Sequence, residues 1–457
     1  MSTQGKRTFR PALHFTPEKM WLNDPNGLVY ENGRYHLFYQ HYPNDTIWGP
    51  MHWGHAISTD LIKWKHLPIA LYPDDLGYIF SGSAVYDKNN TSKLGSENIP
   101  PIVAMFTHHG KYEQQSIAYS LDGITFTKYK NNPVIPNTEI KDFRDPKVFW
   151  NPIKNCWGMV LAAGDRVHFF NSENLICWEK SGEFGPEGNY ARGVWECPDL
   201  FPLETEDGTK WILLVSMGMP VEDRGSRTQY FIGQYDGNTF LSDHSFQQPE
   251  YIDDGFDSYA GVTYHNTEDR ILIAWGINWQ YADKTPTNDY CGMMTFPRKL
   301  SLVKTKQYGY RLVSKPVAWA EYITSKTLIS SEDSLQSETF ALHINGKDPF
   351  SMSFTNAEGQ VLIFGIDERN NIFIDRSKSG TVDFSDVFAR EKYSTLSIPR
   401  LQDGQYNIDI LFDVCSFEMF VDGGLRNFSQ VVYPDSPYNK ITFTGNISVS
   451  YHEIIVE

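Results

Sequence analysis

The chain has 457 residues, which is longer than one ordinary domain and predicts two or three domains unless one is a large all-β unit. Its 40 basic and 56 acidic residues give a net charge of −16. This charge argues against binding to nucleic-acid phosphates or anionic membranes, so we expect a neutral or small-molecule partner.

The five cysteines are odd in number, widely scattered and free of any C-x-x-C pair, so the sequence predicts neither a disulfide framework nor a zinc knuckle. The first residues lack the apolar core of a signal peptide, and no run approaches the roughly 18 apolar residues of a membrane span. We therefore expect a cytoplasmic protein that needs no cofactor. A mature secreted form is the alternative.

Short apolar runs separated by turn residues recur along the first 300 residues, which is typical of an all-β protein. One turn recurs between the third and fourth runs of four successive sets, with its Asp or Asn at Asp60, Asp122, Asn174 and Asp236. The intervals are 62, 52 and 62 residues. Four-stranded units at this period, five in all, predict a five-bladed β-propeller, and a β-sandwich with accidental spacing is the alternative.

The composition changes after the fifth set. We predict a propeller over residues 1–302, a linker over 303–327 and a β-sandwich over 328–457, where apolar and polar residues alternate in strands such as FEMFVDG. The sequence leaves open whether the sandwich supports the propeller, narrows its pocket or forms a homodimer.

In a propeller the innermost strands line a central channel, so their residues converge although they lie far apart in sequence. The five expected innermost strands carry Asp24, Phe80-Ser81, Arg144-Asp145, Glu196 and Asp257. They recur at intervals of 57, 64, 51 and 61 residues, close to the blade period. We therefore expect a ring of acids to face one pocket.

Acids that share a pocket take different roles, because like charges favour a proton on one while hydrogen-bond donors or a guanidinium keep another ionised. We expect Arg144 to keep Asp145 ionised, Asn23 and other polar neighbours to do so for Asp24, and Glu196 to donate a proton. Glycoside hydrolysis needs such a pair of carboxyl groups. Flat faces for sugar rings are expected from Phe80 and the tryptophans, namely Trp21, Trp48, Trp195 and Trp279.

Four motifs now stand in order along the chain: WLNDPNG from Trp21, FSGS from Phe80, FRDPKVFW around Asp145 and WECPDL around Glu196. From His14 to its end the chain resembles glycoside hydrolase family 32, the invertases, inulinases and levanases. The resemblance implies a five-bladed propeller followed by a β-sandwich. It also implies a β-fructofuranosidase that hydrolyses terminal β-fructofuranosyl units of sucrose, fructo-oligosaccharides, inulin or levan with retention.

Position by position, the resemblance implies that Asp24 is the nucleophile, Glu196 the acid and then the base, and Asp145 the stabiliser of the transition state. It further implies that the fructose subsite is lined by Trp21, Asn23, Gln40, Trp48, Phe80, Ser81, Arg144 and Trp279. Tyr290 departs from the family, where Trp is common, and this puts the outer subsite in question.

The sequence also allows alternative functions. His52-Trp-Gly-His55 suggests a metal site, but residues three apart on a strand point to opposite faces, so we expect no metal. An inverting glycosidase would hold its two carboxyl groups about 6.5 to 9.5 Å apart, against about 5 to 5.5 Å in a retaining enzyme. A fructosyltransferase would use the same covalent intermediate, and a carbohydrate-binding propeller without catalysis is the remaining alternative.

Overall fold

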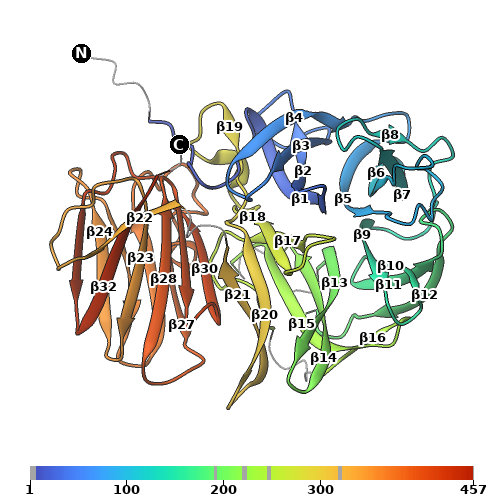
Figure 1. Cartoon of the computed structure of the whole chain (residues 1–457). Helices are drawn as coiled ribbons and strands as arrows, with labels where there is room; N and C mark the ends of the chain where they lie inside the picture. The colour runs from blue at the N-terminus through green and yellow to red at the C-terminus, as the bar shows by residue number, and fades with distance from the viewer. Residues whose placement is uncertain (1–6, 190–192, 219–223, 244–248, 318–321, 456–457) are drawn as a thin grey trace.

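The computed structural model describes residues 7–189, 193–218, 224–243, 249–317 and 322–455. Its architecture is the predicted one: five blade-like sheets surround a central channel, and a two-layer β-sandwich lies beside them (Figure 1). Within the described ranges, two short helical turns accompany the strands, η2 (Ala282–Lys284) and α1 (Glu391–Ser394).

The five sheets follow one another along the chain. Blade one contains β1 (Met20–Glu31), β2 (Arg34–Tyr42), β3 (His52–Ser58), β4 (Trp64–Leu71) and β19 (Tyr290–Cys291). Blade two contains β5 (Tyr78–Tyr86), β6 (Ile102–His109), β7 (Glu113–Ser120) and β8 (Thr127–Lys128). Blade three contains β9 (Phe143–Asn151), β10 (Cys156–Ala163), β11 (Arg166–Ser172) and β12 (Glu179–Phe184). Blade four contains β13 (Trp195–Thr205), β14 (Gly208–Met217), β15 (Arg227–Tyr235) and β16 (Phe240–Ser242). Blade five contains β17 (Tyr259–Thr263), β18 (Ile271–Trp275), β20 (Arg298–Thr305) and β21 (Gly309–Pro316).

The recurring turn seen in the sequence has the same structure in four blades. The side-chain oxygen of Asp60 accepts hydrogen bonds from the backbone N–H groups two and three residues later. The same pair of bonds forms at Asp122, Asn174 and Asp236. Each turn joins the third strand of a blade to the fourth, as the sequence predicted. The short side chain that caps its own turn explains why Asp or Asn recurs there.

The ring closes through blade one, where β19 pairs in parallel with β1, Met20 opposite Tyr290 and Trp21 opposite Cys291. Strands such as β10 are buried on both faces because each blade packs between two others. This explains why their sequences read as continuous apolar runs rather than as alternating ones.

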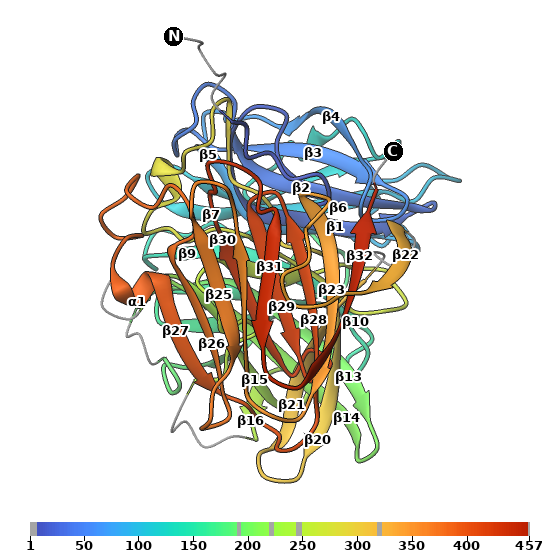
Figure 2. The ribbon, with the colours of Figure 1, turned by 90° about the vertical axis from the view of Figure 1, so that its left-hand side faces the viewer.

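The sandwich has a six-stranded and a five-stranded sheet, and it lies in front of the propeller in Figure 2. The six-stranded sheet contains β22 (Ile323–Leu328), β32 (Ile447–Ile454), β23 (Thr339–Gly346), β28 (Tyr406–Asp413), β29 (Ser416–Val421) and β30 (Arg426–Val431). The five-stranded sheet contains β27 (Thr395–Pro399), β26 (Asn371–Lys378), β25 (Val361–Ile366), β24 (Phe350–Thr355) and β31 (Lys440–Thr444). In β24 the buried residues are Phe350, Met352 and Phe354, the period-two pattern of a strand with one face in the core.

The strand pairing bears on the division into domains. Strands β20 and β21 pair with each other, and β20 pairs with β18, within blade five, so this sheet runs past residue 302 to Pro316. The next strand, β22, pairs with β32 of the sandwich. We therefore propose the boundary between Pro316 and Ile323.

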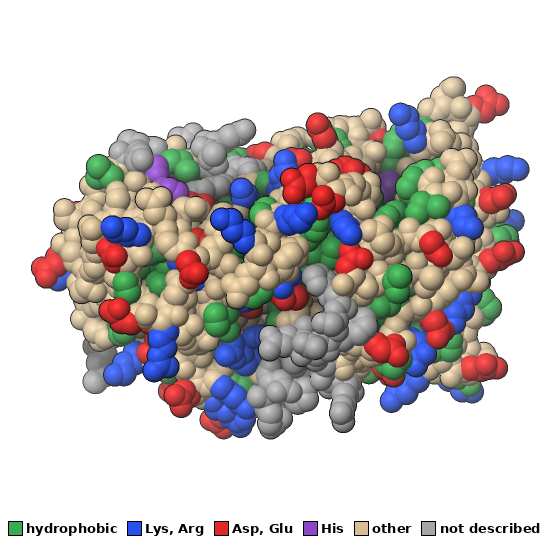
Figure 3. Space-filling view, turned by 90° about the horizontal axis from the view of Figure 1, so that it is seen from below, with side chains coloured by type: hydrophobic (Ala, Val, Ile, Leu, Met, Phe, Trp, Pro, Cys, Tyr) green, Lys and Arg blue, Asp and Glu red, His purple; other side chains and the backbone are tan. Residues whose placement is uncertain are grey.

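Charged side chains of both signs cover the outside. On the side shown in Figure 3, Lys and Arg side chains alternate with Asp and Glu side chains over the described residues. The negative net charge is thus not gathered in one patch on this side.

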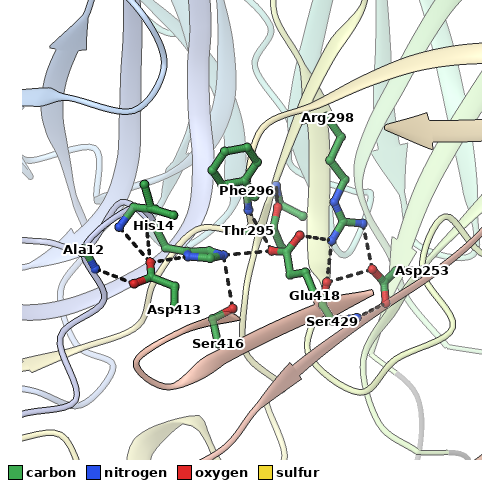
Figure 4. A network of polar contacts seen from close by, with 12 residues as sticks. Ala12, His14, Asp253, Thr295, Phe296, Arg298, Asp413, Ser416, Glu418 and Ser429 are labelled. Carbon is green, nitrogen blue, oxygen red and sulfur yellow. Dashed lines mark hydrogen bonds and ion pairs between the residues drawn. The ribbon is translucent and has the colours of Figure 1, made fainter. Parts of the chain in front are cut away.

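A buried polar network fixes the sandwich to the propeller (Figure 4). Arg298 donates hydrogen bonds to Asp253 and to Glu418 at 2.8 Å each. His14 lies 2.8 Å from Asp413 and 3.2 Å from Glu418 through its two ring nitrogens. Because these charges are paired while fully buried, the network favours one arrangement of the two regions over others.

Candidate active site

The innermost strands of all five blades share one irregularity. Their antiparallel register shifts between Leu22 and Pro25 in β1, Ile79 and Gly82 in β5, and Glu196 and Asp199 in β13. It also shifts opposite Arg144–Lys147 in β9 and between Tyr259 and Val262 in β17. Such bulges redirect side chains and are common beside active sites.

Proline suits these bulges because the extra residue has no ladder hydrogen bond to make. This explains why Asp24, Asp145 and Glu196 all stand next to or near a proline. Asp145 takes a φ of 67° and Cys197 a φ of 44°, conformations that non-glycine residues adopt rarely. The backbone is therefore strained where the acids are presented.

The bulges of blades one to four converge on a cavity of about 300 Å³. It is lined by Asn23, Asp24, Gln40, Trp48, Phe80, Ser81, His109, Glu113, Asp142, Arg144, Asp145, Glu196 and Trp279. A larger hollow of about 810 Å³ between the N-terminal segment and blade one contains only one carboxylate, Glu18, so size alone does not mark the site.

Asp24 is held by three donors. Ser81 Oγ donates to its Oδ2 at 2.6 Å, Asn23 Nδ2 to its Oδ1 at 3.1 Å, and the Cys197 thiol lies 3.3 Å from Oδ2. Burial raises the pKa of Asp24, while the bonds from Ser81, Cys197 and Asn23 oppose that rise. The expected help from Asn23 is therefore present, and it is one of three contributions.

Glu196 is bound at both carboxyl oxygens. Arg144 Nη2 donates to Oε1 at 3.1 Å, and the hydroxyl of Tyr259 donates to Oε2 in a very short hydrogen bond. The other Arg144 nitrogen, Nη1, donates to Glu113 and Asp142. The carboxyl group is thus fixed in orientation without being withdrawn from the cavity.

The ionisation of Asp145 differs from the prediction. Burial raises its pKa to about 8, against the lowering effect of the Arg144 charge and with a further rise from Glu196 and Asp24. The expectation that Arg144 keeps Asp145 ionised was wrong, because burial outweighs the guanidinium, whose hydrogen bonds go to other carboxylates. Asp145 Oδ2 instead accepts a bond from the backbone N–H of Cys197 at 2.9 Å.

Two tryptophans lie elsewhere than predicted. Trp21 is fully buried, and its indole donates to Asn23 at 2.7 Å and stacks on Trp279 at 5.8 Å, so it supports the cavity from behind. Trp195 is buried in the core of blades three and four.

Gln40 lines the cavity while its amide donates to the carbonyl of Ile79.

The fifth acid, Asp257, does not face the channel. It precedes β17 and is buried against Arg376 of the sandwich, with further bonds from Tyr281 and the N–H of Val431. The bulge of blade five falls instead at Ala260 and Gly261. Asp257 lies at the blade interval in sequence but precedes the bulge, so its spacing does not place it in the channel.

Several cavity residues were not predicted. Glu113 and His109 come from the β6–β7 hairpin, Asp142 precedes β9, and Tyr259 and Cys197 touch the acids from inner strands. None of them belongs to the expected set at blade spacing, although Cys197 adjoins Glu196, which does. His55, of the rejected metal motif, is buried and contacts His36 at 3.1 Å.

Two carboxyl groups held in one cavity by donors, a third nearby and aromatic walls define the site of a glycosidase on a β-propeller. The chain matches the family model described as glycosyl hydrolases family 32 N-terminal domain over residues 14–316. It matches the family 32 C-terminal model over residues 310–455. The chain belongs to glycosyl hydrolase family 32.

Proteins similar to this chain support its assignment to the family. The chain is 42% identical over 454 residues to a levanase of Bacillus subtilis, covering 93% of this chain and 67% of that protein. It is 36% identical to an extracellular exo-inulinase of Aspergillus ficuum, covering 98% and 94%. Among solved structures, an exo-inulinase from Aspergillus awamori superposes with a TM-score of 0.89 at 33% identity, covering 98% and 99%. A fructofuranosidase from Schwanniomyces occidentalis in complex with fructosylnystose gives 0.89 at 30% identity, covering 99% of each chain.

Among the described residues, no helix is long and apolar enough to cross a membrane.

Proposed function

We propose that the chain is a retaining β-fructofuranosidase that removes terminal β-D-fructofuranosyl units from sucrose, fructo-oligosaccharides or fructans. The observation that carries this is the placing of Asp24 and Glu196 in one cavity, each oriented by its own donors. Levanase, exo-inulinase and invertase relatives support the substrate class.

In the first step Glu196 donates its proton to the glycosidic oxygen while a carboxylate oxygen of Asp24 attacks C2 of the fructosyl unit. The C2–O bond breaks and its electron pair stays with the leaving sugar. The Glu196 carboxylate that remains accepts hydrogen bonds from the Tyr259 hydroxyl and from Arg144 Nη2.

In the second step the Glu196 carboxylate takes a proton from water, whose oxygen attacks C2 and releases Asp24. Two displacements on opposite faces give net retention. Asp145, at the cavity wall and tied to the N–H of Cys197, is placed to hydrogen-bond fructose hydroxyls more strongly in the transition state than in the ground state.

The test is product analysis on sucrose, 1-kestose, inulin and levan, with the anomer of the first-formed fructose read by NMR before mutarotation. We expect free fructose as the main product and retained β-configuration. An inverted anomer would contradict the assignment of Asp24 as nucleophile. Fructosylated sucrose as the main product would make the chain a transferase instead.

Two further predictions from the sequence stay proposals. A homodimer through the sandwich is tested by light scattering on the purified chain, and monomers at micromolar concentration would contradict it. A cytoplasmic location is tested by fractionating the source cells. The exo-inulinases similar to this chain are described as extracellular.

A further inference from the structure

Four aromatic rings form a continuous row that begins in the cavity and leaves it. Trp48 meets Phe80 edge-on at 6.2 Å, and Phe80 stacks on His109 at 4.1 Å with 8° between the ring planes. His109 in turn lies 6.3 Å from Tyr78. The first three rings line the cavity, and Tyr78 stands beyond it. We call these four residues the aromatic row.

The row follows from the local sheet geometry. Tyr78 and Phe80 are two residues apart on β5, so their side chains share a face, and Tyr78 pairs directly with His109 on β6. These two strands run side by side in blade two (Figure 1). Three of the four rings, Tyr78, Phe80 and His109, therefore stand on two paired strands, and Trp48 reaches them from the segment between β2 and β3.

The row is partly open to solvent. Trp48 is 43% exposed and Tyr78 is 37% exposed. Aromatic surface that is contiguous, exposed and continuous with a cavity is a mark of a ligand-binding groove.

The polar neighbours of the row mark it as the leaving-group side. His109 Nδ1 lies 3.1 Å from Glu113, which accepts hydrogen bonds from Arg144, and Arg144 also binds Glu196. The acid that protonates the leaving oxygen is thus joined through two residues to the ring of His109. A sugar ring has apolar faces and hydroxyl edges, and the row offers it aromatic faces beside fixed polar groups.

We propose that the outer end of the aromatic row holds the departing part of the substrate: His109 contacts the sugar attached to the cleaved fructosyl unit, and Tyr78 contacts the sugar after that. The substrate class favoured by this arrangement is β-fructan chains of three or more units over sucrose. The inference rests on the proposed function.

The test compares Tyr78→Ala with wild type on sucrose, 1-kestose, nystose and inulin. Sucrose has a single departing ring, whereas the others reach Tyr78. We expect kcat/KM for the longer substrates to fall about tenfold further than for sucrose, mainly through KM, which is the loss of one aromatic contact. Tyr78→Phe, which keeps the ring, should restore most of the difference.

Trp150→Ala is the matched control, because Trp150 is an aromatic residue of the same propeller, 39% exposed and outside the row. It should keep the wild-type ratio between substrates. If Tyr78→Ala lost kcat/KM equally on sucrose and on the longer substrates, or on neither, the proposed role of the aromatic row would be wrong. Wild-type turnover of sucrose tests the proposed function separately, and an enzyme that leaves every fructoside intact would overturn both.

Discussion

Arg144 Nη2 lies 3.1 Å from Oε1 of Glu196, so the arginine next to Asp145 in sequence serves the acid of the following blade. The bulge in β9 makes this possible, because it turns Asp145 and Arg144 to different neighbours. Glu196 and Asp145 therefore differ in their hydrogen-bond partners although both line one cavity.

Replacing Glu196 with Gln should lower kcat on sucrose by about 10² to 10⁴-fold, because the proton for the leaving oxygen is lost. Turnover of an activated aryl fructoside, whose leaving group needs no proton, should fall far less in the first step. Asp24→Ala should lose both activities, since no nucleophile remains. Steady-state and burst kinetics on the two substrates check this, and near-wild-type turnover of sucrose by either variant would contradict the roles.

The pH profile should show the shared protonation of the carboxyl groups. Burial raises the pKa of Asp145 to about 8, so the cavity holds a proton below that pH and loses it above. Because the groups are coupled, this value belongs to the cluster. We expect kcat/KM to fall with an apparent pKa near 8.

The variant Asp145→Asn tests whether the fall of kcat/KM near pH 8 comes from the coupled carboxyl groups. It removes a like charge that raises the pKa of its neighbours, so the remaining proton should leave at lower pH and the basic limb should move down. The variant should also lose kcat more than affinity. A basic limb that stays near pH 8 in Asp145→Asn would assign the proton to another group.

Much of the fold could be predicted from short-range rules. The Asp or Asn of the recurring turn bonds its own backbone, so residue type alone located the third hairpin of four blades. The sandwich strands were equally readable from their alternation. The end of the propeller, predicted at residue 302, was less readable, because β20 crosses that position and pairs with β21 in blade five.

Part of the candidate site could also be predicted from the sequence, and part could not. Asp24, Asp145 and Glu196 could be predicted to share a cavity because each lies in the innermost strand of its blade. Their surroundings could not, since Tyr259 binds Glu196 from a bulged strand and Glu113 binds Arg144 from a hairpin, and neither segment carries a motif. Asp257 lies at the expected sequence interval, but it does not face the channel, because its carboxylate forms an ion pair with Arg376.

Asp257→Ala should therefore affect stability rather than catalysis. It would leave Arg376 buried without its carboxylate partner, a change that costs about 3 to 5 kcal/mol of unfolding free energy. Asp375→Ala, which removes a half-exposed carboxylate of β26, should cost under about 1 kcal/mol. Urea unfolding checks the difference. If the folded Asp257→Ala enzyme instead lost most of its kcat, the acid would belong to the active site.

The network around His14 predicts that stability falls in mild base. Burial lowers the pKa of His14, but the hydrogen bonds and charges of Asp413 and Glu418 raise it further, to about 9. The folded state thus binds a proton more tightly than the unfolded state. Its contribution is complete below about pH 6.5 and is lost as the pH rises through about 9, roughly 3 kcal/mol at most.

The measurement is the urea midpoint at pH 6.5 and pH 9 for wild type, His14→Gln and His343→Gln. His343 is the matched control, a sandwich histidine that contacts Asp409 at 2.7 Å but is partly exposed. Wild type and the control should lose stability between the two pH values, whereas His14→Gln should start lower and change little. A wild-type decline that persists in His14→Gln would contradict this prediction, because a group other than His14 would then release the proton between the two pH values.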